Sequence, residues 1–75
     1  MQMSLEFVAI KSANAVEVIP GGNLPSGIFL DEADISRFRV SGPAFKMLKG
    51  TYDLAAFQAW INELEVNGNV IDMIE

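Results

Sequence analysis

The 75-residue sequence contains no cysteine and no histidine. These two residue types supply the thiol nucleophile, many metal ligands and most general bases that act near pH 7. Their absence excludes disulfide cross-links and zinc sites built from Cys and His. It also leaves every serine and threonine hydroxyl without the usual activating base. We therefore expect that the chain is not an enzyme and uses no cofactor and no metal.

Basic residues are also scarce, since five lysines and arginines stand against ten acids and the net charge is −5. Phosphate contacts need clustered cations, so we expect neither nucleic acid nor an anionic membrane surface as a partner. No apolar run approaches the roughly 20 residues of a membrane span. Residues 1–4 lack the basic and apolar regions of a signal peptide. We expect a cytoplasmic protein, located in the host cytoplasm or the virion if its source is viral.

Apolar residues are plentiful at 51%, and they include five Phe, one Trp and one Tyr. This content indicates a folded chain, and the length fits one small domain over residues 1–75. Because no disulfide or zinc site can help, stability has to come from the core, from self-association or from a partner.

Strand patterns dominate the first half of the chain. Residues 5–10 alternate with period two and residues 15–19 are rich in β-formers, which predicts a hairpin over residues 4–19. A loop rich in glycine and proline follows at residues 20–27, and residues 28–30 suit a short buried strand.

Residues 31–40 fit two patterns. The early acids and the late Arg37 and Arg39 suit the dipole of a helix. Residues 36–40 also alternate like an edge strand with its charges outward, and we favour this second interpretation.

Two helices are predicted in the second half. Pro43 suits the first residue of a short helix over residues 43–49, and Gly50 suits its left-handed terminator. A longer helix begins after Asp53 and ends near Gly68. Its core-facing stripe consists of Leu54, Phe57, Trp60, Ile61 and Leu64.

A closing strand at residues 70–74 completes the order β-β-β-(β)-α-α-β. We predict an α+β domain, in which a small antiparallel sheet is packed on one face by two helices. The predicted core consists of Leu5, Phe7, Ile28, Leu30, Phe57, Trp60, Ile61 and Leu64.

Residues 27–34, Gly-Ile-Phe-Leu-Asp-Glu-Ala-Asp, resemble the Walker B motif of DEAD-box helicases and related ATPases. The resemblance implies that Asp31 would hold the nucleotide magnesium and Glu32 would orient the attacking water. The sequence has no G-x-x-x-x-G-K-[ST] loop to hold the phosphates. Asp31, Glu32 and Asp34 could alternatively bind a divalent cation through oxygen ligands. We interpret the segment as a buried strand that ends in an acidic turn.

Several surfaces are candidates for protein association. The first hairpin is apolar on both sides, so Val8 and Ile10 would need a second covering layer. Leu24 could be offered at a loop tip. Small or apolar residues on the longer helix form a second arc that permits close helix approach, namely Ala55, Ala59 and Val66. Four of the five basic residues form a strip, namely Arg37, Arg39, Lys46 and Lys49.

The sequence thus predicts a non-catalytic protein–protein interaction or assembly module. It would act as a small acidic homo-oligomer, with a dimer favoured by the general preference for twofold assemblies. The alternative is a viral or phage-type accessory factor that inhibits a host protein, in one version by acidic mimicry of nucleic acid.

Overall fold

The computed structural model describes residues 2–22 and 34–74. Predictions that concern Ile28, Leu30 and the Walker B-like acids Asp31 and Glu32 therefore lie outside the described residues. The described elements are β1 (Met3–Lys11), β2 (Ala15–Pro20), β3 (Ile35–Gly42), β4 (Gly50–Asp53), α1 (Leu54–Val66) and β5 (Val70–Ile74).

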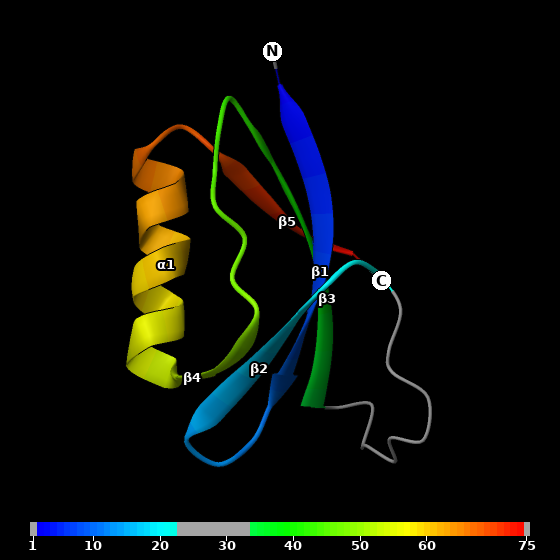
Figure 1. Ribbon diagram of the computed structural model, residues 1–75, viewed down its shortest axis with the longest axis vertical. Coiled ribbons are helices and arrows are strands. Elements are labelled where there is room, and N and C mark those ends of the chain that lie inside the picture. The colour runs from blue at the N-terminus through cyan, green and yellow to red at the C-terminus, as the bar shows by residue number, and fades with distance from the viewer. Residues whose placement is uncertain (1, 23–33, 75) are drawn as a thin grey trace.

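The strands form one five-stranded antiparallel sheet in the order β4-β2-β1-β3-β5. α1 covers one face of this sheet, as Figure 1 shows. The predicted first hairpin is confirmed by β1 and β2, and the strand interpretation of residues 36–40 is confirmed by β3. β3 is not the edge strand that was expected, because it pairs with β1 on one side and with β5 on the other. The sheet places side chains of alternate residues on its two faces, so each strand contributes both to the α1 side and to the opposite side.

The predicted fold class is wrong in its helices and in its strand order. Along the described ranges the order is β-β-β-β-α-β, and α1 is the one α-helix there. Residues 43–49 run extended beside α1 instead of forming a first helix; we call this segment the strap. A seven-residue helix cannot offset its own nucleation cost, so tertiary contacts decide its conformation.

Gly50 was expected to end the helix at residues 43–49. It does adopt a positive φ of 113°, but it begins β4. The sequence reading did not anticipate this strand, in which Tyr52 pairs with Val16 of β2. The left-handed backbone conformation of Gly50 was thus predicted correctly, but the helix that it was expected to end was not.

Both ends of α1 agree with the sequence. The Asp53 side chain accepts a 2.7 Å hydrogen bond from the Ala56 amide, which satisfies one of the free N–H groups of the first turn. At the other end Gly68 has a φ of 88°, and the Asn69 amide donates to the Leu64 carbonyl at 2.9 Å. This left-handed termination is the one predicted for Gly68.

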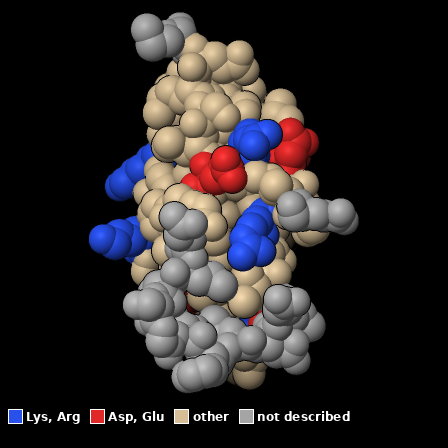
Figure 2. Space-filling view, turned by 90° about the vertical axis from the view of Figure 1, so that its right-hand side faces the viewer, with Lys and Arg blue, Asp and Glu red and all other residues tan. Residues whose placement is uncertain are grey.

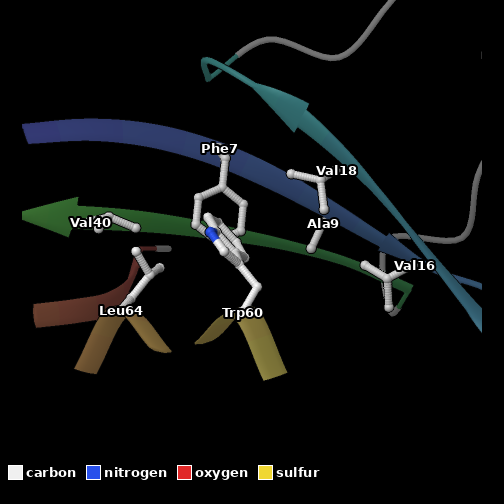
Figure 3. Packing of buried hydrophobic residues seen from close by; sticks show 7 residues of the cluster. All are labelled: Phe7, Ala9, Val16, Val18, Val40, Trp60 and Leu64. Carbon is white, nitrogen blue, oxygen red and sulfur yellow. The ribbon is translucent and has the colours of Figure 1, made fainter. Parts of the chain in front are cut away.

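The core lies between α1 and the sheet. Trp60 and Leu64 point from the helix towards the strands, as Figure 3 shows. The Trp60 ring meets Phe7 edge-on at 5.3 Å between centroids, and Phe7 stacks on Phe38 at 5.1 Å. The buried cluster consists of Phe7, Ala9, Val16, Val18, Val40, Trp60 and Leu64.

The observed core differs from the predicted one in three respects. Leu5 is 45% exposed, because β2 pairs with β1 only from Phe7 onward and the first half of β1 extends beyond it. Phe57 and Ile61 are half-buried and pack on the rim of the cluster. Four residues that were not expected in the core belong to it, namely Ala9, Val16, Val18 and Val40.

Candidate association surface

The strap is tied to its surroundings through its backbone carbonyls. In each case a side chain from β4, α1 or the turn after α1 donates the hydrogen bond. The three bonds run from Asn69 Nδ2 to Ala44 O at 3.2 Å, from Trp60 Nε1 to Lys46 O at 2.9 Å and from Tyr52 Oη to Lys49 O at 2.9 Å. These carbonyls are spread along the segment, so the bonds hold it beside α1 in an extended form that a helix could not share.

Asn69 secures the first part of the strap and depends on a glycine opposite it. The residue is only 4% exposed, and its Nδ2 also donates to the Leu64 carbonyl at 3.1 Å. Its Oδ1 is buried and has no hydrogen-bond partner within the described ranges. A Cβ at position 42 would lie 1.9 Å from this oxygen, so the site requires Gly42.

A groove of about 460 Å³ separates α1 from the strap. Its apolar part includes Trp60 and Leu64 from the helix and Leu48 from the strap. Lys46 and Glu63, one from each element, are exposed and also line it. Lys46 and Glu63 therefore carry opposite charges on the two sides of one groove.

The outward face of α1 carries the predicted second arc. Ala55, Ala59 and Val66 are all exposed, and Val66 is 84% exposed. A helix over residues 43–49 could have packed against this arc within the chain, but that segment is the strap, which contacts α1 on the side of Trp60. Ala59 lies at the edge of the groove beside the strap and is still exposed. The described part of the chain therefore leaves the second arc free for contact with another molecule.

The four bases predicted to form one strip are divided between two sides of the molecule. Arg37 and Arg39 pair with Val8 and Glu6 of β1, and so share the sheet face turned away from α1. Lys46 and Lys49 belong to the strap on the α1 side. Near neighbours in sequence are separated here because β3 ends at Gly42 and the chain then crosses to the other side of the sheet.

On the face turned away from α1, charges of both signs lie side by side, as Figure 2 shows. Arg39 stands between Glu6 of β1 and Asp72 of β5 in the strand register. Its Nη2 lies 3.6 Å from Glu6 Oε2, and both side chains are about half exposed, so the pair adds little stability. Arg39 is thereby largely compensated within its own sheet.

The remaining candidates are placed as follows. Val8 and Ile10 are 0% and 7% exposed, so they are buried within the chain itself. Leu24 lies outside the described residues. Within residues 2–22 and 34–74 the acids are spread over the sheet and the helix layer, for example Glu17 on β2 and Glu63 on α1. In these ranges they form no row on one face of the kind that nucleic-acid mimicry needs.

Sequence reasoning missed the residues that hold the strap, namely Tyr52, Asn69 and the indole N–H of Trp60. One signal was present, because a buried Trp or Tyr generally needs an acceptor for its polar group. Residues 43–49 contain no side-chain oxygen, so they could accept only through their carbonyls. Nothing in the sequence indicated which carbonyls would be used.

Across the described residues, no group of three or more Asp or Glu side chains is placed to hold a metal ion. No helix within the same ranges is long and apolar enough to cross a bilayer. Comparison with protein-family models, with curated proteins and with solved structures finds no significant match for this chain.

Proposed function

We propose that this chain acts without catalysis, as a protein–protein association module whose first partner is a second copy of itself. The observation that carries the proposal is the outward face of α1. Ala55, Ala59 and Val66 are exposed there, and no described segment of the chain covers them.

Little of α1 is buried within the single chain. Of its 13 residues, only Trp60 and Leu64 are buried. The small side chains at positions 55 and 59 allow another backbone to approach closely. Burying the exposed Val66 in such a contact would contribute up to about 1.5–3 kcal/mol. A small domain without cross-links commonly gains part of its stability in this way.

The test is the mass of the purified chain in solution. Sedimentation velocity from micromolar to millimolar concentration should show a dimer that dissociates on dilution. Ala59→Arg places a long cation on the exposed face of α1, so it should give a monomer that still unfolds cooperatively.

Val8→Lys is the informative contrast. Val8 is 0% exposed within the single chain, so a lysine there should unfold the protein instead of dissociating a folded dimer. A parent chain that remains monomeric at millimolar concentration would contradict the proposal of self-association. A folded monomeric Val8→Lys variant, with a dimeric Ala59→Arg variant, would move the interface from the helix to the sheet.

A further inference from the structure

Opposite charges are sorted between the two elements of the helix layer. α1 contains Glu63 and Glu65 and no base, whereas the strap contains Lys46 and Lys49 and no acid. In the described part of the chain, the one ion pair joins Arg39 and Glu6 on the other side of the sheet. The groove between α1 and the strap therefore has an acid, Glu63, on its helix side and a base, Lys46, on its strap side.

The backbone of the strap runs nearer to the sheet than the backbone of α1 does, as Figure 1 shows. Together with the groove between the two elements, this makes the helix a ridge beside a recess. The groove of about 460 Å³ lies at the boundary between them, with Glu63 on the helix side and Lys46 on the strap side. A ridge beside a recess is complementary in shape to a second copy of the same surface when that copy is turned over.

The two acids of α1 lie where they destabilise the helix of a single chain. Glu63 and Glu65 lie in the last turns of the helix, next to carbonyl groups that carry the negative end of the helix dipole, and no base lies in the last turn. Each such acid disfavours the helix, because cations are the side chains that this end stabilises. A cation supplied by another molecule would remove that cost at Glu63.

We propose that two copies dock face to face, with α1 of each copy in the recess over the strap of the other. A twofold axis that runs parallel to α1 and passes over the groove produces this arrangement. It brings Glu63 of each copy against Lys46 of the other, and both contacts form by the same rotation. An axis perpendicular to α1 would instead place helix on helix and oppose acids to acids. This inference rests on the proposed self-association and names its surface, symmetry and charged pair.

Two charge reversals test the arrangement, and both residues are exposed, so folding should survive. Lys46→Glu should place acid against acid at both contacts, and Glu63→Lys should place base against base. We expect each variant alone to dimerise about tenfold more weakly than the parent, measured by sedimentation equilibrium. Each reversal changes the net charge of −5 by two, so Glu63→Lys carries −3. Reduced net repulsion cannot explain a loss of association in that variant.

Mixing the two variants is the decisive experiment. In a mixed dimer the helix of one chain is acidic against a basic strap, and the helix of the other is basic against an acidic strap. Both contacts are attractive, so the equimolar mixture should dimerise as tightly as the parent within about threefold. An ion pair within one chain would be broken in both variants, and mixing could not restore it.

The control is Arg37→Glu, which makes the same charge change as Lys46→Glu on the opposite face of the sheet. It should leave the dimer intact. A parent dimer that is unaffected by both reversals, or a mixture no tighter than the separate variants, would overturn this docking and leave self-association standing. A parent chain that is monomeric throughout would overturn both. Loss of the dimer in Arg37→Glu to the same extent would place the interface elsewhere.

Discussion

The strap and α1 carry the same kinds of sequence signal and adopt different structures. Both segments start at a residue favoured at helix N-termini and end near a glycine with positive φ. α1 has 13 residues and buries Trp60 and Leu64 against the sheet. The strap has seven residues, too few to form a stable helix alone, and its carbonyls are taken by side chains of other elements. Termination signals therefore locate boundaries, while length and tertiary hydrogen bonds decide what lies between them.

Trp60 contacts both the core under α1 and the strap, so its replacement should have the largest effect on stability. Trp60→Ala removes a buried ring that contacts Phe7 and also removes the bond to Lys46 O. We expect a loss of about 3–5 kcal/mol in the free energy of unfolding, measured by urea denaturation. Phe57→Ala should cost less, because Phe57 is only half-buried.

Trp60→Phe separates the two roles of this side chain. It keeps an aromatic ring in the core and removes the indole N–H, so the cost should fall to a small part of that of Trp60→Ala. Trypsin should then cleave faster after Lys46, in the strap, because the Lys46 carbonyl has lost its donor. Equal cleavage of the strap in Trp60→Phe and in the parent would show that this bond does not hold it.

Gly42→Ala should have the next largest effect on stability, because it disturbs the contact between Asn69 and the first residues of the strap. The new Cβ would lie 1.9 Å from Asn69 Oδ1 and 2.9 Å from Asn69 Cα, so Asn69 must move and release Ala44 O. We expect a cost of about 1–3 kcal/mol by thermal or urea unfolding. Gly22→Ala is the matched control, since its nearest neighbour would be 3.7 Å away. A similar cost in both variants would assign the effect to glycine in general.

Tyr52→Phe should have a smaller effect at the other end of the strap. It removes the exposed 2.9 Å bond to Lys49 O and leaves the ring in place. We expect a loss of about 0.5–1 kcal/mol in the free energy of unfolding and faster cleavage by trypsin after Lys49. Gln58→Ala, which removes a 3.2 Å bond to Asn62 within α1, should leave cleavage in the strap unchanged.

Glu65→Lys should have the smallest effect, and it should raise the stability of the fold where the other substitutions lower it. A cation in the last turn of α1 favours the helix dipole where the acid opposes it. We expect a gain of about 0.3–1 kcal/mol, seen as a higher melting temperature by circular dichroism. Glu17→Lys on β2 makes the same change in charge far from the C-terminal end of α1. Equal stabilisation by both would indicate an effect of net charge alone.

Part of the candidate surface was predictable and part was not. The arc of Ala55, Ala59 and Val66 followed from the angular positions of residues on a helix, and the structure leaves all three exposed. The placement of Lys46 and Glu63 on opposite sides of one groove was not predictable, because it depends on a strap that the sequence presents as a helix. The strip of four bases was an error of the same origin, since distance along the chain says little about which side of a sheet a residue occupies.

The sequence by itself determined the elements whose signals are local. Period-two alternation specifies β1, β2 and β3, and Asp53 and Gly68 limit α1, because these signals act through backbone geometry and hydrogen bonds within a few residues. Only the tertiary structure decided the conformation of residues 43–49. Three donors, Tyr52, Trp60 and Asn69, reach it from other elements, and the energy of those bonds is absent until the helix and the sheet have come together.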